Sequence, residues 1–319
     1  MSTLLVGYRA SDLFERGRHG AKRSSSLLNG DTTCHVLDIY QRHAIEKTHH
    51  AKVVCSPHLP EGPWDEIRFK TGPKLMSGEL SLDLLQEISR LLGGNLKPPR
   101  FTLDFEGKER DRNALLEKVV GDPGRIRDFS AKWRTSVPGI APIELTSFPG
   151  CFCHRRPDDG GLALAEVVSR ELSALESRPE TLNLLDMGCG CGLVGFLVAS
   201  AVKGVNLVMV DSHSRAVEAA ALNSRNLGIP AEVILADNGT PERMDGSFDV
   251  FVGNPPYYSD YRIAEVFLET AKRALKPNGV CYTVVKNDAG LRPVQERFFP
   301  SVEVIHRRGY CVLKSLNHA

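Results

Sequence analysis

The short stretch GNPPYY around Asn254 combines residue types that can hold a flat amino group. Pro255 disfavours helical geometry at Asn254, and the two adjacent prolines stiffen the backbone. The Asn254 side-chain oxygen and the Pro255 carbonyl can accept both N–H groups of a planar amine, which directs the nitrogen lone pair at an electrophile. Tyr257 offers a flat face for a base, whereas Tyr258 is either a second face or a core residue. The predicted catalytic residues are Asn254, Pro255 and Tyr257, and the predicted substrate contacts here are Pro256 and Tyr258.

A glycine-rich turn lies further upstream, where the sequence reads DMGCGCG. Glycines at a strand-to-helix turn let the backbone approach a ligand that side chains would block. The spacing is G-x-G-x-G, unlike the G-x-G-x-x-G of dinucleotide-binding enzymes, and an acidic residue stands two positions before the first glycine. This favours a ligand with a charged amino-acid end and no phosphates, although a tight turn without a ligand is the alternative. The predicted ligand contacts are Asp186, Gly188, Gly190 and Gly192.

More polar residues follow the next two apolar runs. Asp211 ends the first run, at the position where α/β folds place a carboxylate on ribose hydroxyls. Asp237 and Asn238 end the second, where an acidic side chain can accept from an adenine amino group. Each of them could instead cap a helix. Together with Asp186 they indicate a site for adenosine joined to an amino acid, so we predict S-adenosylmethionine as the cofactor, contacted also by Asn254.

Alternating strand and helix patterns in the second half of the chain would position these residues. Short apolar runs that end in polar or glycine residues are typical of buried parallel strands. The alternation predicts a Rossmann-like α/β fold, with a mostly parallel sheet, helices on both faces and a closing β-hairpin. Strands are predicted at 183–188, 206–211, 231–237, 247–254 and 280–287, helices at 192–202, 214–228 and 261–279, and the hairpin turn at Arg307–Gly309.

The first half of the chain predicts a second α/β domain of similar layout. Strand-like runs occur at 34–41, 51–57, 64–70 and 101–105, and helical patterns at 81–94 and 109–122. No glycine-rich turn follows the first of these runs, so we expect this domain to lack a nucleotide pocket. A stretch rich in Pro, Ser, Thr and Gly at 134–150 suggests the boundary. We therefore predict a degenerate domain over residues 1–140 and a catalytic domain over residues 141–319.

The bulk composition narrows the class of protein. Of the 319 residues, 42% are hydrophobic and 25% charged, as in ordinary globular proteins. Lys and Arg nearly balance Asp and Glu, 40 against 39, so net charge alone does not indicate a nucleic-acid partner. No apolar run suits a signal peptide or a membrane span, and we predict a cytoplasmic monomer without a membrane partner. The cysteines are predicted to be buried free thiols, and C-x-C is too close for the usual zinc knuckle, so no metal is predicted.

One further segment, FPGCFCHRRPDDGGLAL, fits the pattern P-G-x-F-x(5)-D-x-G without a gap. Its pattern positions are Pro149, Gly150, Phe152, Asp158 and Gly160. Together with N-P-P-Y, this segment resembles the ribosomal RNA guanine-N2 methyltransferases, a family of class I methyltransferases that use S-adenosylmethionine. In that family the loop closes over cofactor and target. The resemblance therefore implies that Phe152 and Asp158 contact the substrate.

The same resemblance implies transfer of a methyl group to the N2 amino group of a guanine in ribosomal RNA. It also implies that the N-terminal domain is a degenerate copy that supports the catalytic domain and docks RNA. The cluster Arg16, Arg18, Lys22 and Arg23 is a candidate phosphate contact or simply a solvated face. Three alternatives stay open: glutamine-N5 methylation, adenine-N6 methylation, and a non-catalytic RNA assembly factor that binds S-adenosylmethionine.

Overall fold

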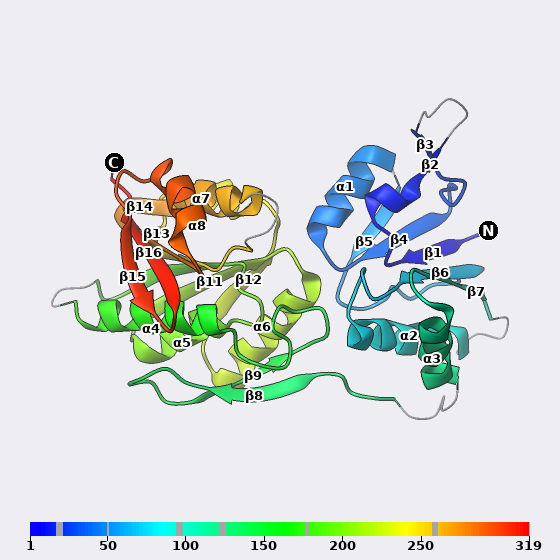
Figure 1. Cartoon of the computed structure of the whole chain (residues 1–319), viewed down its shortest axis with the longest axis horizontal. Helices are drawn as coiled ribbons and strands as arrows, with labels where there is room; N and C mark the ends of the chain where they lie inside the picture. Colours follow the sequence, from blue (N-terminus) through cyan, green and yellow to red (C-terminus); the bar gives the residue numbers. More distant parts are fainter. Residues whose placement is uncertain are drawn as a thin grey trace. The chain divides into compact units, whose positions relative to one another are not determined.

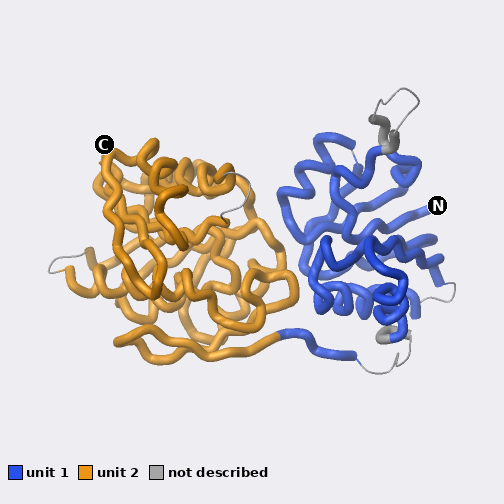
Figure 2. The backbone as a smooth tube through the Cα atoms, viewed as in Figure 1, with its two compact units in different colours: residues 1–130 blue, residues 131–319 orange. Residues whose placement is uncertain are grey.

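The computed structural model describes residues 1–16, 22–49, 51–93, 98–120, 126–175, 179–256 and 261–318. The chain divides into two compact units, Met1–Ser130 and Ala131–Ala319, which Figure 2 colours separately. Each unit has its own buried apolar clusters, so each is described by itself. No helix in the described parts of the chain is both long and apolar enough to cross a membrane.

The second unit is built on a seven-stranded sheet. Its strands are β10 (Leu182–Met187), β11 (Val205–Asp211), β12 (Ala231–Leu235), β13 (Phe248–Gly253), β14 (Leu275–Val285), β15 (Glu303–Arg307) and β16 (Tyr310–Leu316). The order is β12-β11-β10-β13-β14-β16-β15, with the first five strands parallel and the last two antiparallel. The predicted mostly parallel sheet with a closing hairpin is confirmed. The carboxyl ends of β10, β11 and β13 meet at the edge where such sheets bind ligands.

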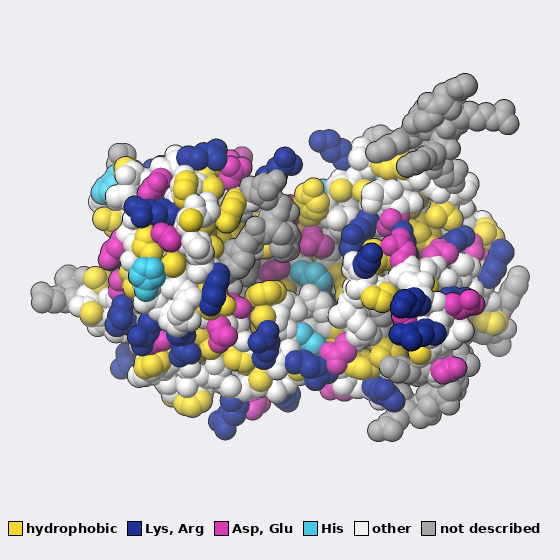
Figure 3. Space-filling view, in the orientation of Figure 1, with side chains coloured by type: hydrophobic (Ala, Val, Ile, Leu, Met, Phe, Trp, Pro, Cys, Tyr) yellow, Lys and Arg dark blue, Asp and Glu magenta, His cyan; other side chains and the backbone are white. Residues whose placement is uncertain are grey.

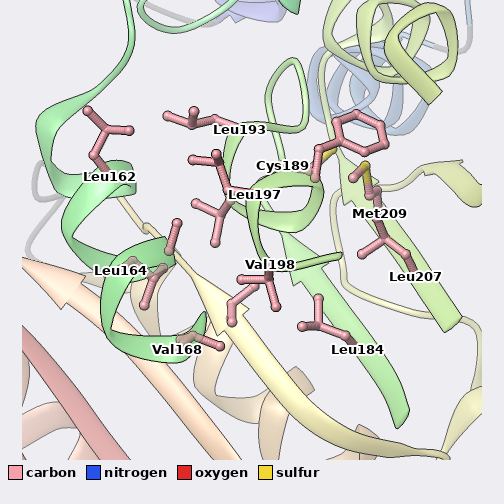
Figure 4. Close-up of a cluster of buried hydrophobic side chains, with 14 of the residues drawn as sticks. Leu162, Leu164, Val168, Leu184, Cys189, Leu193, Leu197, Val198, Leu207 and Met209 are labelled. Carbon is pink, nitrogen blue, oxygen red and sulfur yellow. The ribbon is translucent and has the colours of Figure 1, made fainter. Parts of the chain in front are cut away.

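Helices cover both faces of this sheet. They are α4 (Asp159–Ser173), α5 (Leu193–Ala201), α6 (Ser214–Leu227), α7 (Arg262–Ala274) and α8 (Asp288–Glu296), with a 3-10 turn η3 (Glu242–Met244). Leu184 of β10 packs in a cluster with α4, α5 and α6, whereas its neighbour Leu185 packs in a cluster with α7 and α8. Figure 1 shows α4 and α5 on one side of the sheet and α7 and α8 on the other. In Figure 4, Leu162 of α4 and Leu197 of α5 lie in the first of these clusters.

Two antiparallel strands, β8 (Ala131–Thr135) and β9 (Ile143–Ser147), open the second unit. The Asn223 side chain of α6 accepts from the Thr146 N–H and donates to the Thr146 C=O, both at 2.8 Å. These two hydrogen bonds attach the β8–β9 pair to α6, which packs on the seven-stranded sheet. The division after Ser130 therefore precedes the predicted boundary at residue 140, because the Pro- and Gly-rich stretch forms a paired hairpin instead of a linker.

The end of α7 corrects one expectation. The helix stops at Ala274 and β14 starts at Leu275, whereas the pattern predicted a helix through residue 279. The Pro-Asn-Gly segment is an irregularity within β14, where the pairing with β13 shifts register. Asn278 has a φ of +65°, and its N–H donates to the Asn317 C=O. The Pro-Asn-Gly segment therefore interrupts the pairing of a strand, whereas it was predicted to end a helix.

The first unit contains a five-stranded parallel sheet in the order β5-β4-β1-β6-β7. Its main elements are β1 (Thr3–Val6), β4 (Thr32–Val36), α1 (Ile39–His49), β5 (Lys52–Cys55), β6 (Glu66–Thr71), α2 (Gly78–Gly93), β7 (Arg100–Phe105) and α3 (Glu109–Val120). Its first strand is central, the next two lie on one side and the last two on the other. The five parallel strands of the second unit follow the same order, so the predicted similarity of layout is confirmed.

Two details of the first unit differ from the sequence expectations. The central strand β1 was not predicted, and the strand expected at 34–41 ends at Val36, with α1 following from Ile39. The predicted basic cluster falls around the short strands β2 (Phe14–Arg16) and β3 (Lys22–Ser24), which follow the 3-10 turn η1 (Ala10–Leu13). Arg18 and the side chains of the other three cluster members lie outside the described residues.

Candidate active site

The glycine-rich turn after β10 lies at the carboxyl edge of the sheet. Gly188, Gly190 and Gly192 have φ angles of +69°, +57° and +93°, a region that glycine reaches at low cost. The N–H groups of Gly188 and Cys189 both donate to the C=O of Val210 in β11, at 2.8 and 3.1 Å. The neighbouring strand therefore holds the turn in place before α5 begins.

The three glycines have different surroundings. A Cβ on Gly188 would stand 2.7 Å from the Phe267 ring, and one on Gly192 would stand 2.3 Å from the Phe196 ring. At Gly190 a Cβ would meet no atom within 4 Å, and Gly190 lines the cavity described below. Gly188 and Gly192 thus allow close packing, whereas Gly190 leaves space open for a ligand.

Asp186, near the end of β10, is a buried carboxyl group beside the turn. Its side chain accepts from the Gly195 N–H of α5 at 2.9 Å, and the residue is only 3% exposed. Burial raises the pKa of Asp186 to about 7; the Gly195 hydrogen bond opposes the increase and the nearby Asp211 carboxylate adds to it. Asp186 therefore changes charge near neutral pH, and a cationic ligand would favour its charged form.

Asp211, at the end of β11, holds the glycine-rich turn from the strand next to β10. One carboxylate oxygen accepts from the Gly190 N–H at 2.8 Å, and the other accepts from the His213 N–H at 2.9 Å. His213 lines the same cavity, and its burial, with a smaller effect of Arg215, lowers its pKa to about 4. The wall near Asp211 therefore combines a carboxylate with a neutral imidazole.

A cavity of about 190 Å³ opens at this edge of the sheet. The predicted site residues on its wall come from four segments: β10 with the turn after it, the end of β11, the residue after β13, and the P-G-x-F loop before α4. Among the predicted site residues, those on the wall are Asp186, Gly188, Gly190, Asp211, Asn254, Phe152 and Asp158. The parts predicted to hold a cofactor and those predicted to hold a substrate thus share one cavity.

Asn254 enters this cavity directly after β13. Its Nδ2 donates to the Asp158 carboxylate at 2.8 Å, and the same Asp158 oxygen accepts from the Gly161 N–H at 2.6 Å as the N-cap of α4. A carboxylate only accepts hydrogen bonds, so its partner must be the amide nitrogen of Asn254. Among the described residues, no hydrogen bond reaches the Asn254 Oδ1, which leaves that oxygen as an acceptor on the cavity side.

The P-G-x-F loop carries a second set of wall residues. Phe152 is 71% exposed although it lines the cavity, so its ring stands at the mouth. The Cys153 thiol lies 3.8 Å from the second oxygen of Asp158. Arg215 of α6, only 2% exposed, donates to the Pro149 C=O at 3.3 Å. A buried arginine therefore holds the start of this loop against α6.

Two residues that organise the site were not predicted from the sequence, Asn223 and Arg215. Besides its bonds to β9, Asn223 donates to the Cys191 C=O at 2.9 Å, so one fully buried amide joins β9 to the glycine-rich turn. Both residues belong to the Ala-rich helix α6, where half of the buried positions hold alanine. Polar side chains within the apolar stripe of that helix are the signal that could have identified them.

Several predicted site residues lie elsewhere. Asp237 is half-buried and Asn238 exposed after β12, and neither they nor Gly192 belong to the described wall of this cavity. Pro255 is buried and Pro256 half-buried next to Asn254, also without lining it. Tyr257 and Tyr258 lie outside the described residues. The prediction of an adenine contact at Asp237 therefore has no support from this cavity.

The cysteines of the site are free thiols, and among the described residues they do not form a metal-binding cluster. All cysteines of the chain are free, and those on the cavity wall are Cys151, Cys153, Cys189 and Cys191. Burial raises the pKa of Cys151 and of Cys191 to about 12, so both are protonated at neutral pH. In the described ranges no group of three or more His, Cys, Asp or Glu side chains could hold a metal ion.

Comparisons with known proteins agree with this architecture. Over 321 aligned residues, 97% of this chain and 82% of the relative, the chain is 28% identical to ribosomal RNA small subunit methyltransferase C of a Marinomonas species. It is 31% identical to the protein of that name from Pseudomonas aeruginosa over 161 residues, about half of this chain and 45% of the relative. Ribosomal RNA large subunit methyltransferase G of Streptomyces avermitilis is 28% identical over 72% of this chain and 58% of the relative.

A solved structure shares the whole fold. It is the 16S rRNA guanine-N2 methyltransferase of T. thermophilus in complex with AdoMet and guanosine. The TM-score is 0.75, with 16% sequence identity, and the match covers 100% of this chain and 88% of the other. Residues 142–314 match the family described as methyltransferase small domain, a span that includes the glycine-rich turn, Asn254 and Asp158. The chain belongs to the methyltransferase small domain family.

Proposed function

We propose that this protein transfers a methyl group from S-adenosylmethionine to the exocyclic N2 amino group of a guanine in ribosomal RNA. One observation carries the proposal: the oriented amide of Asn254 shares a cavity with the carboxylates of Asp186 and Asp211 beside a glycine-rich turn. The relatives named for ribosomal RNA methylation, and the fold neighbour solved with AdoMet and guanosine, support the choice of RNA and of guanine.

The residues of the cavity fit S-adenosylmethionine. Gly190 presents open space at the wall where a side chain would intrude. Asp186 can balance the ammonium group of the cofactor, and Asp211 stands at the strand end that receives ribose hydroxyls in such sheets. When bound, S-adenosylmethionine supplies an electrophilic methyl group.

Asn254 and Pro255 then position the amine that accepts the methyl group. The Asn254 Oδ1 accepts one N–H of the guanine amino group, which directs the nitrogen lone pair into the cavity. The Pro255 C=O, which lies next to Asn254 outside the described cavity wall, is the predicted acceptor for the second N–H. Asp158 holds the Asn254 amide in the required orientation through the 2.8 Å hydrogen bond. The amine gives up its proton after it has gained the methyl group, so the site needs no strong base.

Phe152 completes the substrate side of the site. Its exposed ring stands on the cavity wall, and an exposed aromatic face can stack on a base that has left its helix. We assign Tyr257 the same role, stacking on the base, from the chemistry of its side chain alone. Ribosomal RNA as the substrate also implies that the protein works where ribosomes are, so the expected cytoplasmic location is part of this proposal.

A labelling experiment tests the proposal. The purified protein is incubated with methyl-labelled S-adenosylmethionine and, separately, with undermethylated small-subunit and large-subunit RNA, because the relatives carry names from both subunits. Digestion to nucleosides should yield labelled N2-methylguanosine from one of the two RNAs. Asn254→Ala should abolish the label while leaving the affinity for RNA near the wild-type value.

The same experiment separates the alternatives. Label in N6-methyladenosine would replace guanine by adenine as the target, and label in a protein would indicate a glutamine amide. A wild-type protein that binds S-adenosylmethionine and RNA but transfers no label would support a non-catalytic assembly factor. Each of these outcomes contradicts the proposed reaction.

A further inference from the structure

Four side chains lead from the cavity wall to the tip of the β15–β16 hairpin, and we call them the hairpin rim. They are Arg156, Tyr310, Lys286 and Arg308. Arg156 is exposed and lines the cavity itself. Lys286 directly follows β14, Arg308 lies in the hairpin turn, and Tyr310 is the first residue of β16. Because β16 runs antiparallel to β14, its first residue lies at the same edge of the sheet as Asn254.

Contacts around Gly160 place the hairpin tip beside the reactive amide. The point that a Cβ on Gly160 would occupy is 3.2 Å from the Tyr310 ring and 3.1 Å from the Asp158 carboxylate. Asp158 in turn bonds to Asn254 at 2.8 Å. The Tyr310 ring and the Asp158 carboxylate therefore both lie next to Gly160, and that carboxylate orients the Asn254 amide.

Lys286 adds a cation to this position. Its Nζ lies 4.2 Å from the centre of the Tyr310 ring, a cation–π contact that holds the ammonium group at the tip. Lys286 is exposed, and within the described ranges no acidic side chain forms an ion pair with it. Arg156 likewise has no ion pair with a described residue. Lys286 therefore holds an exposed cation on the Tyr310 ring, and Arg156 adds a second exposed cation at the cavity wall.

The hairpin turn contributes further positive charge. Arg307 and Arg308 both pair with one buried carboxylate, that of Glu166 in α4, with Arg308 at 2.8 Å. Two guanidinium groups thus share a single negative charge, and the tip keeps a surplus positive charge. Figure 3 shows Lys and Arg side chains on this face around the end of the hairpin, with some acidic side chains among them.

We propose that the hairpin rim binds backbone phosphates of the RNA strand on which the target guanine lies. This inference rests on the proposed function and names the surface that holds its substrate. Unpartnered cations are the groups that phosphates recruit, and phosphate contacts set the register of a strand without reading its sequence. Cations interleaved with accessible aromatic rings, here the exposed Phe152 and the half-buried Tyr310, are typical of grooves for unpaired strands. The rim therefore holds an unpaired segment so that one base reaches Asn254.

The salt dependence of RNA binding tests this inference. Binding of a short single-stranded RNA containing one guanine to the full chain is measured by fluorescence anisotropy over a range of salt concentrations. The variant is Lys286→Gln, which removes the charge of an exposed side chain and leaves the Arg–Glu pairs intact. The matched control is Lys203→Gln, an exposed lysine between α5 and β11, at the opposite edge of the sheet.

Loss of one phosphate contact has a defined signature. We expect Lys286→Gln to weaken RNA binding several-fold and to reduce the slope of log K against log salt by about 0.7, the value for one contact on a single strand. Methylation should show a higher KM for RNA at an unchanged kcat, and Lys203→Gln should match the wild type. Equal slopes for wild type and Lys286→Gln, or an equal loss in Lys203→Gln, would overturn the inference.

The outcomes also separate this inference from the proposed reaction. If the wild type forms N2-methylguanosine and Lys286→Gln keeps the wild-type salt slope, phosphate binding by the hairpin rim is contradicted and the proposed reaction is supported. If the slope falls as expected but no N2-methylguanosine forms, phosphate binding by the hairpin rim is supported and the proposed reaction is contradicted. A wild type that binds no RNA contradicts both.

Discussion

The Asn254 amide donates to the same carboxylate oxygen of Asp158 that caps helix α4. The two residues lie in the N-P-P-Y stretch and the P-G-x-F loop, which are far apart in the sequence. One carboxylate thus fixes both the start of a helix and the orientation of a side chain at the end of β13. Because the amide cannot rotate without losing this bond, its oxygen is set as an acceptor before any substrate arrives.

Replacing Asp158 should therefore impair turnover more than cofactor binding. We expect Asp158→Ala to lower kcat by about tenfold to a hundredfold, the scale of a misplaced reacting group, with an unchanged Kd for S-adenosylmethionine. The lost helix cap should also cost about 1 kcal/mol of unfolding free energy. Single-turnover kinetics and denaturant unfolding measure the two effects.

Asp158→Ser is the control for this prediction. Serine can still cap α4 but is too short to reach Asn254. Its stability should return toward the wild-type value while kcat stays low. Recovery of kcat along with stability would show that Asp158 acts only through the helix.

Most of this site could be predicted because its residues follow simple local patterns. Asp186, Gly190 and Asp211 stand at strand ends that apolar runs mark clearly, and Asn254 stands before two prolines. Parallel strands in one sheet have their carboxyl ends at the same edge. Residues at neighbouring strand ends are therefore close together for any conformation of the connecting loops. The pattern failed where a strand contains turn residues, as in β14, and where a helix contains a proline, as in the unpredicted α8 with Pro293.

Tertiary contacts between distant segments could not be predicted in the same way. Nothing near Asn223 in the sequence reveals that its amide joins β9 to the glycine-rich turn. Asp237 illustrates the converse, because it ends an apolar run like Asp211 yet does not belong to the described cavity wall. Position at a strand end therefore does not by itself give a residue a place in the site, because the fold decides which strand ends border the cavity.

Replacing Asn223 should destabilise the protein and loosen the turn. Asn223→Ala removes three hydrogen bonds and leaves buried backbone groups at Thr146 and Cys191 without a partner. We expect a loss of about 2–4 kcal/mol in the free energy of unfolding and weaker binding of S-adenosylmethionine. Denaturant unfolding and calorimetry measure both, and Asn206→Ala, which removes an exposed Asn–Asn contact, should change neither by much.

Asp186 makes the stability of the cofactor-free protein depend on pH. The native carboxyl has a pKa of about 7, above the roughly 4 of an unfolded chain, so the native state binds more protons between these values. The Asp186 contribution to the free energy of unfolding should therefore fall as pH rises from about 4 to 7, by up to the order of 4 kcal/mol. The buried His213, with its pKa lowered to about 4, acts in the opposite direction over the lower part of this window. Asp186→Asn removes only the falling contribution, so urea unfolding should show the stability of the wild type, relative to Asp186→Asn, falling across the window. An unchanged difference between the two proteins from about pH 4 to 7 would contradict the raised pKa of Asp186.

Cofactor binding should shift the same equilibrium. The ammonium group of S-adenosylmethionine favours the ionised carboxylate, so binding below about pH 7 should release a proton from Asp186. Calorimetry at pH 6 in buffers of different ionisation enthalpy counts the protons released. Asp186→Asn should release fewer protons than the wild type. Equal release by both proteins would mean that the carboxyl is already ionised without the cofactor.

A comparison of Gly190 with Gly228 separates backbone strain from cofactor exclusion. Both have left-handed φ angles, +57° and +65°, and a Cβ would meet no atom within 4 Å at either site. Gly190→Ala and Gly228→Ala should therefore each cost about 1 kcal/mol of stability, the price of a left-handed alanine. Only Gly190 lines the cavity, whereas Gly228 ends α6. We expect Gly190→Ala to weaken S-adenosylmethionine binding at least tenfold and Gly228→Ala to leave it unchanged, as measured by calorimetry. Equal affinities in the two variants would place the cofactor away from Gly190.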